Sequence, residues 1–198
     1  MNELVFPNIN IENLAQWEGD LSPLECIEIK DETHNVKSFT FKSKLDAWFH
    51  FLPGQHTTLF LNIDGSEVMR TYTIASSPTR PHTITITNKR MNDGVVTNWM
   101  HESLKVGDCI DALDIGGSFS VALDKPRTKI LLMSGGSGIT PMLSMARYCI
   151  DLSLNVDLIF IHHAQSSKDL IAKDELEYYQ LHKSNFKDIL SVMLPIQI

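Results

Sequence analysis

The sequence predicts two fold units in succession: a small antiparallel six-stranded β-barrel, then a partial, doubly wound parallel sheet of the α/β class. The first observation is a series of short β segments between residues 24 and about 121, separated by turn residues such as Pro53-Gly54 and Gly116-Gly117. The second is a change of period after residue 126, beyond which apolar segments alternate with helical ones. The length of 198 residues accommodates two such units.

Six segments of the first unit have the composition of strands. Thr83-Ile84-Thr85-Ile86-Thr87 shows the pattern, because apolar and hydroxyl residues alternate there as in a half-buried strand. Six such strands with one short helix predict an antiparallel barrel. The expected strands are Leu24–Glu32, Val36–Lys42, His56–Ile63, Met69–Ala75, Thr83–Asn88 and Cys109–Ile115.

The second unit follows a βαβαβ pattern, which is half of a doubly wound sheet. Continuously apolar strands that alternate with helices predict a parallel sheet covered on both faces. The expected strands are Lys129–Met133, Val156–Ile161 and Ile189–Leu194, and the expected helices are Pro141–Leu152 and Lys168–His182.

Charge supports a boundary between the units. Residues 1–124 carry 9 Lys or Arg and 17 Asp or Glu (9 − 17 = −8), whereas residues 125–198 carry 8 and 7 (8 − 7 = +1). We therefore expect a polar, loosely held N-terminal arm over residues 1–22, the barrel over 23–124 and the α/β unit over 125–198.

Composition excludes several classes of protein. A chain with 43% hydrophobic and 21% charged residues is typical of a globular protein. A net charge of −7 without a basic run argues against a nucleic-acid partner. No apolar run approaches the roughly 20 residues of a membrane helix. The first 20 residues contain no Lys or Arg and so do not resemble a secretory or mitochondrial signal, which predicts a cytoplasmic location.

Cysteine and histidine usage predicts no metal site. Cys26, Cys109 and Cys149 are an odd number without a C-x-x-C pair, which excludes a disulfide framework and an iron–sulfur cluster held by this chain alone. We expect each to pack as a small apolar residue. His162 and His163 are adjacent on a predicted strand, so their side chains should point to opposite faces.

The strongest local signal is a glycine-rich turn between a predicted strand and a predicted helix, with the sequence Ser134-Gly135-Gly136-Ser137-Gly138-Ile139-Thr140-Pro141. Glycines let the backbone approach a pyrophosphate, and a helix N-terminus offers unpaired N–H groups. Pro141 fits the first helical turn. The spacing is not G-x-G-x-x-G, so tight packing of strand against helix is an alternative reason for the glycines.

Three further segments are informative in combination. Arg70-Thr71-Tyr72-Thr73 places Arg70 and Tyr72 on one face of a strand and both threonines on the other, an arrangement able to hold a phosphate and a ring. In Asp93-Gly94-Val95-Val96-Thr97, Thr97 is the expected N-cap of a helix through about residue 104. Pro53-Gly54-Gln55-His56 is a turn that enters a strand. An ordinary surface strand and capping without a ligand are the alternatives.

In this order and at these intervals, the four segments resemble the ferredoxin–NADP reductase superfamily, and most nearly the NADH oxidoreductases of hybrid-cluster proteins. The resemblance covers about residues 24–194. It implies that the barrel binds FAD and that the α/β unit binds a nicotinamide nucleotide. By the same resemblance, Arg70 pairs with an FAD phosphate, Tyr72 packs against the flavin, and Thr73 hydrogen-bonds near flavin N5.

The resemblance assigns the remaining site residues as well. Tyr72, Thr73 and Thr140 are the candidate catalytic residues, with Thr140 facing the nicotinamide. The nicotinamide-nucleotide turn comprises Gly135, Gly136, Gly138, Thr140 and Pro141. Gln55 and His56 should lie near the flavin. Further FAD contacts are implied for Asn88, Lys89, Gly94, Val95, Val96 and Thr97.

The implied activity is transfer of a hydride from NADH or NADPH to FAD, then of single electrons to an iron–sulfur, haem or similar acceptor. The acceptor is expected in an iron–sulfur protein or a C-terminal ferredoxin-like domain absent from this sequence. Gln165 stands where many members carry Arg, which favours NADH, although Ser166 and Lys168 could compensate. The family's nucleotide domain continues beyond the last predicted strand, so we expect the chain to be C-terminally truncated.

Two other functions fit the sequence. One is a flavin-binding module without turnover, whose truncated second unit is an interaction surface. The other is a two-domain globular protein whose glycine turn is purely structural.

Overall fold

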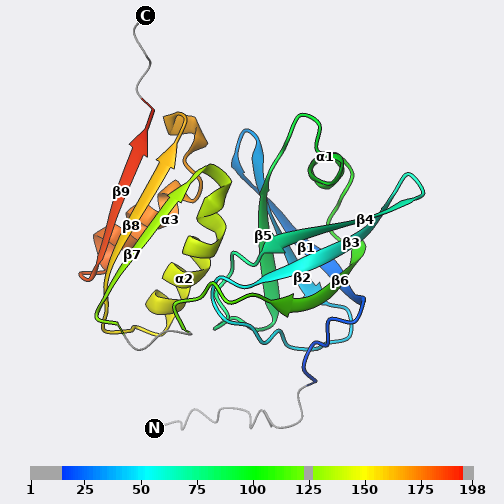
Figure 1. The fold of residues 1–198 in the computed structure, drawn as a ribbon, viewed down its shortest axis with the longest axis horizontal. Coiled ribbons are helices and arrows are strands. Elements are labelled where there is room, and N and C mark those ends of the chain that lie inside the picture. The colour runs from blue at the N-terminus through cyan, green and yellow to red at the C-terminus, as the bar shows by residue number, and fades with distance from the viewer. Residues whose placement is uncertain (1–14, 123–126, 194–198) are drawn as a thin grey trace, which may run out of the picture.

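The computed structural model describes residues 15–122 and 127–193, which form two sheets side by side (Figure 1). One is a six-stranded antiparallel sheet and the other a three-stranded parallel sheet. In the described ranges, no helix has the length and apolar character needed to cross a membrane.

The six strands close into the predicted barrel. Their order is β4-β3-β6-β1-β2-β5, and a bridge between Ile74 and Ile86 joins the two outer strands. The backbone N–H of Ala75 donates to the carbonyl of Thr85 beside this bridge (2.7 Å). The strands are β1 (Ser22–Thr33), β2 (Val36–Ser43), β3 (His56–Ile63), β4 (Ser66–Thr73), β5 (Thr83–Lys89) and β6 (Cys109–Gly116).

Alternation along β5 fills the barrel as the sequence predicts. Ile84 and Ile86 are fully buried in the core together with Phe39 and Phe41. Thr85 faces outward, and its hydroxyl contacts that of Thr40 at 3.1 Å. Because each apolar side chain points inward, the barrel has a continuous core.

The helix α1 (Val95–Glu102) closes one end of the barrel, with Val96 and Met100 in the core. The prediction that Thr97 is its N-cap is wrong, because Gly94 occupies that position. Thr97 lies inside the first turn, where its hydroxyl donates to the Gly94 carbonyl (3.2 Å) and accepts from the Met91 N–H (3.2 Å). The helix also ends earlier than expected.

The described part of the predicted arm is not loosely held. The side chain of Trp17 is 4% exposed and packs on Phe49 with ring centroids 5.3 Å apart. Its backbone N–H donates to the carbonyl of Trp48 (2.8 Å). Trp17 therefore belongs to the barrel core, while the rest of the predicted arm before residue 15 lies outside the described residues.

The parallel sheet has strands β7 (Lys129–Gly135), β8 (Asp157–Ala164) and β9 (Phe186–Val192) in that order. The helices α2 (Ile139–Asp151) and α3 (Lys173–His182) connect them. The third strand was predicted three residues too late. The second helix begins five residues later than predicted, because Ser167–Asp169 forms a separate 3₁₀ turn and Ala172 adopts a positive φ of 55° before the helix.

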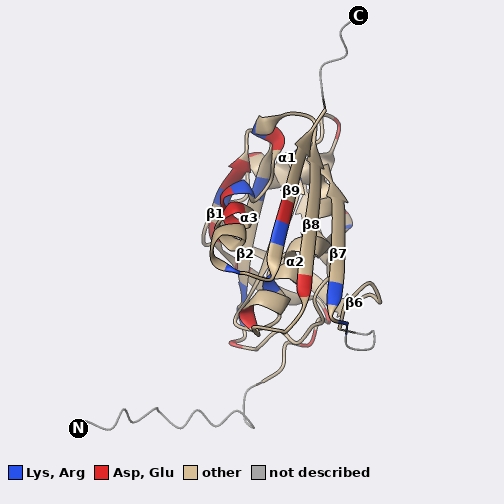
Figure 2. Ribbon diagram, turned by 90° about the vertical axis from the view of Figure 1, so that its left-hand side faces the viewer, with Lys and Arg blue, Asp and Glu red and all other residues tan. Residues whose placement is uncertain are grey.

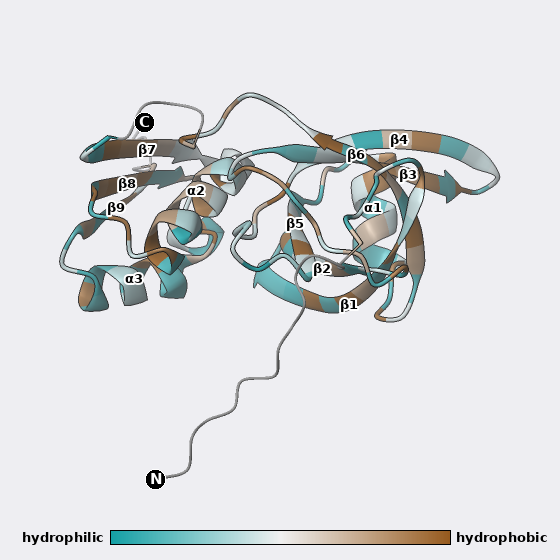
Figure 3. Ribbon diagram, turned by 90° about the horizontal axis from the view of Figure 1, so that it is seen from below, coloured by the Kyte–Doolittle hydropathy of each residue, from teal (hydrophilic) through white to brown (hydrophobic). Residues whose placement is uncertain are grey.

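The prediction that helices cover both faces of this sheet is wrong for the described residues. Crossover connections between parallel strands are right-handed, so strands that follow one another in order place successive helices on the same face. Figure 3 shows α2 and α3 together on one side. On the other side Leu131, Met133, Ile159 and Ile189 are exposed by 56%, 59%, 39% and 42%.

The free face is mostly apolar over β7 and β8, whereas β9 adds the exposed Lys187 to it. Figure 2 shows charged residues in β7 and β8 only near their amino-terminal ends, at Lys129 and Asp157. His162 and His163 point to opposite faces, as expected: His162 is fully buried beneath the helices and His163 is exposed.

The prediction for the cysteines holds at two of three positions. Cys26 and Cys149 are buried, whereas Cys109 is exposed. Cys109 begins β6 and faces away from the core, because the next residue, Ile110, points inward.

Candidate functional site

The glycine turn at the end of β7 is open on its outer side. Gly136–Gly138 forms a 3₁₀ turn, and α2 begins at Ile139 with Pro141 in its first turn. A Cβ atom added at Gly135, Gly136 or Gly138 would meet no atom within 4 Å. Tight packing of strand against helix therefore does not explain these glycines, and the open space fits an approaching ligand.

A cavity of about 240 Å³ adjoins this turn at the carboxyl ends of β7 and β8. That end of a parallel sheet is where ligands bind in doubly wound folds. Lys89, from the end of β5, reaches the same cavity, so both units contribute to it. The lining residues are Asn35, Val36, Lys89, Gly135, Gly136, Ser137, His163, Ala164, Gln165, Asp169 and Ile171.

Asp169 is a lining residue that sequence reasoning missed. Its carboxylate accepts a hydrogen bond from the Ser166 hydroxyl (2.6 Å), and the Nδ1 atom of His34 lies 3.8 Å away. The Ser166 hydrogen bond, together with the nearby positive charge of Lys89, lowers the pKa of Asp169. A carboxylate therefore stands in the cavity near neutral pH.

The side chains of β4 alternate between the two faces of the strand, as the sequence predicts for Arg70 and Thr71. Arg70 pairs with Leu59, and Thr71 pairs with Thr58, whose hydroxyl lies 2.8 Å from its own. The exposed Arg70 side chain donates through Nη1 to the Met69 carbonyl (2.7 Å) and has no carboxylate partner among the described residues. Its guanidinium is thus available to an anionic ligand.

The end of β4 combines an aromatic and a hydroxyl side chain. Tyr72 is half-buried against the barrel core, and burial raises its pKa, so the phenol keeps its proton. Thr73 pairs with His56 across the strands. Three predicted site residues therefore lie together at one end of the barrel.

Gln55 fixes the turn beside this strand end. Its side chain accepts from the Leu52 N–H (2.7 Å) and donates to the Gly117 carbonyl (2.9 Å). Its backbone carbonyl accepts from the N–H of Ile74, the residue after Thr73 (2.9 Å). Gln55 is therefore next to the candidate flavin site, but its amide group is occupied by protein partners.

Asn88 and Lys89 face different surroundings although they are adjacent. Asn88 is 3% exposed and joins β5 to α1, donating to the Met100 sulfur (3.0 Å) and contacting His101 Nε2 through Oδ1 (2.9 Å). Lys89 instead lines the cavity at the glycine turn. The structure thus places Lys89, and not Asn88, beside the candidate nucleotide site.

The start of α1 has a crowded glycine and an exposed first helical residue. A Cβ at Gly94 would lie 2.3 Å from Thr97 Oγ1. Val95 is 56% exposed, whereas Val96 points into the core. The first amides of a helix have no intrahelical acceptor, so this end can receive a phosphate oxygen.

The helix α2 joins the two halves of the site. The hydroxyl of Ser144, which is fully buried, donates to the carbonyl of Ser76 (2.7 Å) and accepts from the N–H of Gly54 (3.2 Å). Thr140, one turn earlier on α2, is 7% exposed, and its hydroxyl donates to the carbonyl of Ser137 in the glycine turn (3.3 Å). The contact through Ser144 therefore holds the helix that begins at the glycine turn against the segment that follows β4 and the turn at Gly54.

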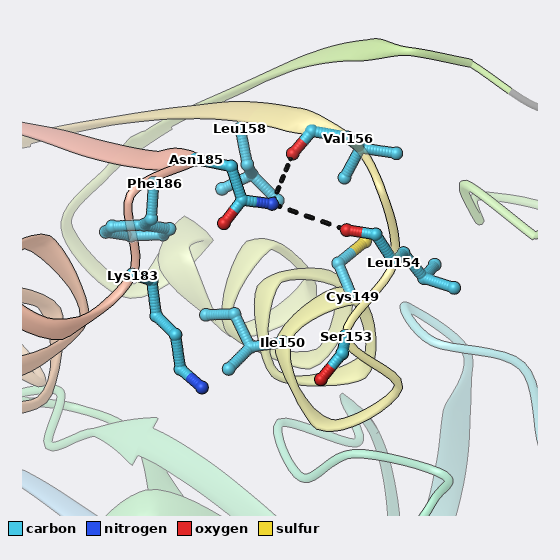
Figure 4. Close-up of a pocket in the computed structure, with 9 residues that line it drawn as sticks. All are labelled: Cys149, Ile150, Ser153, Leu154, Val156, Leu158, Lys183, Asn185 and Phe186. Atoms are coloured by element: carbon cyan, nitrogen blue, oxygen red, sulfur yellow. Dashed lines mark hydrogen bonds between the residues drawn. The ribbon is translucent and has the colours of Figure 1, made fainter.

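A second cavity, of about 110 Å³, lies at the opposite end of the sheet (Figure 4). The side-chain amide of Asn185 closes it by donating to the carbonyls of Leu154 (3.3 Å) and Val156 (2.7 Å). The Cys149 thiol borders it, and burial raises the pKa of this thiol to about 11. The cavity is apolar and remote from the glycine turn, so it is not part of the candidate site.

Family models match both units. Residues 23–122 match the oxidoreductase FAD-binding domain, and residues 132–193 match the oxidoreductase NAD-binding domain. The chain belongs to the ferredoxin reductase family of FAD- and NAD-binding oxidoreductases. The family model over the barrel includes the β4 motif and the start of α1, and the second model includes the glycine turn.

Curated relatives are reductases of about twice the length. The glycine betaine monooxygenase reductase subunit of Pseudomonas aeruginosa is 44% identical over 178 residues, which are 90% of this chain and 48% of that protein. The NADH oxidoreductase HCR of Escherichia coli is 32% identical over 156 residues, which are 79% of this chain and 47% of that protein. The chain therefore spans about half the length of the relatives it matches.

The fold is also similar to solved structures. The FAD/NAD-binding domain of nitric oxide dioxygenase from Vibrio cholerae superposes with a TM-score of 0.79 at 18% identity. The match covers 89% of this chain and 80% of that domain. A barrel followed by a parallel α/β sheet is therefore the architecture of both proteins.

Proposed function

We propose that this chain is the flavin- and nicotinamide-binding part of a reductase that accepts a hydride from NADH and passes single electrons to an iron–sulfur or haem acceptor. The observation that carries the proposal is the contact through Ser144, which holds the helix that follows the open glycine turn against the segment that follows β4. Bound FAD would supply the chemistry, because it accepts two electrons together and releases them singly.

The protein's own residues then bind and orient the two ligands. The free Arg70 guanidinium suits an FAD phosphate, and the exposed start of α1 suits its pyrophosphate. Tyr72 offers a flat, neutral ring beside the flavin, and Thr73 a hydroxyl. Gly135, Gly136 and Gly138 leave room for the nicotinamide nucleotide, and Thr140 would face its nicotinamide ring.

The cavity favours NADH over NADPH. The two nucleotides differ by a 2′-phosphate, which the carboxylate of Asp169 would repel. Gln165, also in the cavity, offers no positive charge to offset this repulsion. Lys89 is the cation present there, and it suits the pyrophosphate beside the glycine turn.

The relatives support an acceptor in another polypeptide or in a further domain. Their names describe a monooxygenase reductase subunit and an NADH oxidoreductase. By analogy, we infer an iron–sulfur protein, or an iron–sulfur domain in a longer form of this chain, as the acceptor. The unpaired thiols of Cys26, Cys109 and Cys149 suit the reducing conditions of the cytoplasm.

Anaerobic mixing of the FAD-loaded chain with NADH tests the proposal. We expect the visible absorbance of the oxidised flavin to disappear, and a one-electron acceptor such as ferricyanide to restore it. A chain that binds FAD but stays oxidised would instead be a flavin-binding module without turnover. A chain that does not bind FAD at all would exclude both functions.

A further inference from the structure

The face of α2 that meets the barrel carries three polar side chains at helical spacing. Ser144, Arg147 and Asp151 are separated by three and four residues, so they lie along one face. Figure 1 shows α2 between the parallel sheet and the barrel. All three side chains bond to the segment that follows β4, through Ser76, Ala75 and the pair Thr79 and Arg80.

Arg147 makes the most constrained of these contacts. Its Nη1 atom donates to the Ala75 carbonyl at 2.7 Å, and its Nε and Nη2 atoms donate to the two carboxylate oxygens of Glu175 on α3 at 2.8 and 2.5 Å. The Tyr179 hydroxyl donates to the same carboxylate (2.7 Å). Only 16% of the Arg147 side chain and 26% of the Glu175 side chain are exposed.

The charges of this pair are maintained despite burial. Burial alone would lower the pKa of Arg147, but the hydrogen bonds and charge of Glu175 raise it above its ordinary value. Burial would likewise raise the pKa of Glu175, and Arg147 lowers it. A planar guanidinium held at both carboxylate oxygens has a fixed direction, which leaves Nη1 aimed at the barrel.

The acceptor of Nη1 lies close to the candidate flavin site. Ala75 is fully buried and is two residues beyond Thr73. One turn earlier on α2, Ser144 holds both the next residue, Ser76, and Gly54, which precedes Gln55. Together, Arg147 and Ser144 attach the nucleotide-binding unit to the two barrel segments that should flank the flavin.

We propose that Arg147, oriented by Glu175 and aided by Ser144, is a positioning residue that sets the distance and angle between the nicotinamide at the glycine turn and the flavin at the end of β4. The inference rests on the proposed function. Arg147 itself contacts neither ligand in this assignment; it acts through the Ala75 carbonyl and the helix that begins at the glycine turn.

Replacing Arg147 tests this role. In the FAD-loaded full chain, we expect Arg147→Met to leave the FAD dissociation constant within about twofold and to lower the rate constant of flavin reduction by NADH about tenfold or more. Arg147→Lys should retain an ion pair and stability. It should not recover the rate of flavin reduction, because one ammonium group cannot reproduce the three hydrogen bonds that the guanidinium donates to Ala75 and Glu175.

A binding signal that involves no turnover provides the second readout. A non-reducing NADH analogue stacked on the oxidised flavin should give a long-wavelength charge-transfer absorbance in the wild-type chain. We expect Arg147→Met to lose this band even at saturating analogue. Hydrogen exchange supplies a third readout, because Ser144→Ala should accelerate exchange at the Gly54 amide, which then lacks its acceptor.

Arg80→Ala is the matched control. It breaks the pair with Asp151 at the far end of the same helix face, where the Arg80 side chain is 60% exposed, so we expect little change in rate or absorbance. Equal losses in Arg80→Ala and Arg147→Met would overturn the inference, and so would loss of FAD binding in Arg147→Met. A wild-type chain that is not reduced by NADH would instead overturn the proposed function.

Discussion

At the scale of single residues, Arg70 has the simplest role to test. Its guanidinium is exposed and is hydrogen-bonded to the Met69 carbonyl, so its removal should change the free energy of unfolding little. A hydrogen bond to a charged group contributes roughly 1.5–3 kcal/mol, and loss of a phosphate contact of this kind corresponds to about a 10- to 100-fold weaker affinity. We expect this loss for FAD in Arg70→Ala, measured by fluorescence titration of the apo chain.

Lys187→Ala provides a control for the Arg70 variant. Lys187 is an exposed cation on β9, in the other unit, and its removal should leave FAD affinity unchanged. If Arg70→Ala bound FAD as tightly as the wild-type chain, the phosphate site assigned to β4 would be wrong.

We expect Asp169 to determine the preference for NADH over NADPH. Replacing it by Ser removes the negative charge that a 2′-phosphate would meet in the cavity, a repulsion of about 1–4 kcal/mol between unit charges about 4 Å apart, depending on their exposure to water. We expect Asp169→Ser to lower KM for NADPH about tenfold, with a much smaller change for NADH. Steady-state kinetics with both nucleotides measures this, and Asp174→Ser, in the first turn of α3, is the control. An unchanged NADPH-to-NADH ratio would remove Asp169 from the specificity site.

His162 makes stability depend on pH. Burial is the main cause that lowers its pKa; its Nδ1 atom lies 3.0 Å from the Ser134 hydroxyl, and its buried Nε2 atom has no partner among the described residues. In the unfolded chain the pKa is about 6.5, so below that pH the unfolded state binds a proton that the folded state resists. The free energy of unfolding therefore falls as pH decreases from about 6.5, by at most about 1.4 kcal/mol per pH unit for one group.

We expect His162→Leu to flatten this pH dependence. Urea denaturation at a series of pH values measures it, and the residual slope should come partly from His101, whose pKa burial also lowers. His50→Leu, at an exposed position of the barrel unit, should keep the wild-type slope. A full wild-type slope in His162→Leu would show that another group controls the pH dependence.

At the scale of elements, substitutions in the glycine turn distinguish a structural role of its glycines from a role in ligand binding. Gly135 and Gly138 have ordinary negative φ angles of −130° and −65°, and a Cβ at either meets open space. We expect Gly135→Ala and Gly138→Ala to change the free energy of unfolding by less than about 1 kcal/mol. NADH affinity should nevertheless fall about tenfold or more, because a methyl group occupies space meant for the nucleotide.

Thermal unfolding and NADH titration of the same two variants make this comparison. Gly94→Ala is the opposite case, because its Cβ would collide with Thr97 Oγ1, so it should destabilise α1. Destabilised Gly135 and Gly138 variants with normal NADH affinity would support the purely structural interpretation of the turn.

Local pattern predicted most of the elements. The bounds of β3 agree with the prediction residue for residue, because turn chemistry at Pro53-Gly54 and Asp64-Gly65 flanks a clear strand. The late start of α3 could not be predicted, since Ala172 adopts a left-handed conformation that its residue type disfavours. The placement of both helices on one face depends on strand order, which a single sequence does not specify.

The candidate site, too, could be predicted only where it depends on local sequence. Arg70, Tyr72 and the glycines belong to short motifs whose chemistry is local. Arg147 and Glu175 meet only through tertiary structure, and the one available signal was a single arginine within a partly apolar helix. Asp169 gave a weaker signal still, because an acidic residue in a loop is ordinary.

At the scale of the whole molecule, the barrel and the parallel sheet act as two binding units held by α2. Covalent linkage alone would not fix their orientation, but the buried contacts of Ser144 and Arg147 do so at the point where the two ligands should meet. Transfer between two bound groups requires reacting atoms about 3–3.5 Å apart. We therefore propose that this arrangement supports direct hydride transfer.

Stopped-flow reduction with isotopically labelled nucleotide tests that claim most directly. The FAD-loaded chain is mixed anaerobically with NADH, and then with NADH that carries deuterium at the transferred position of C4. We expect rapid loss of flavin absorbance in both cases, at a saturating rate that is severalfold slower with the deuterated nucleotide. Flavin that remains oxidised at saturating NADH would contradict it.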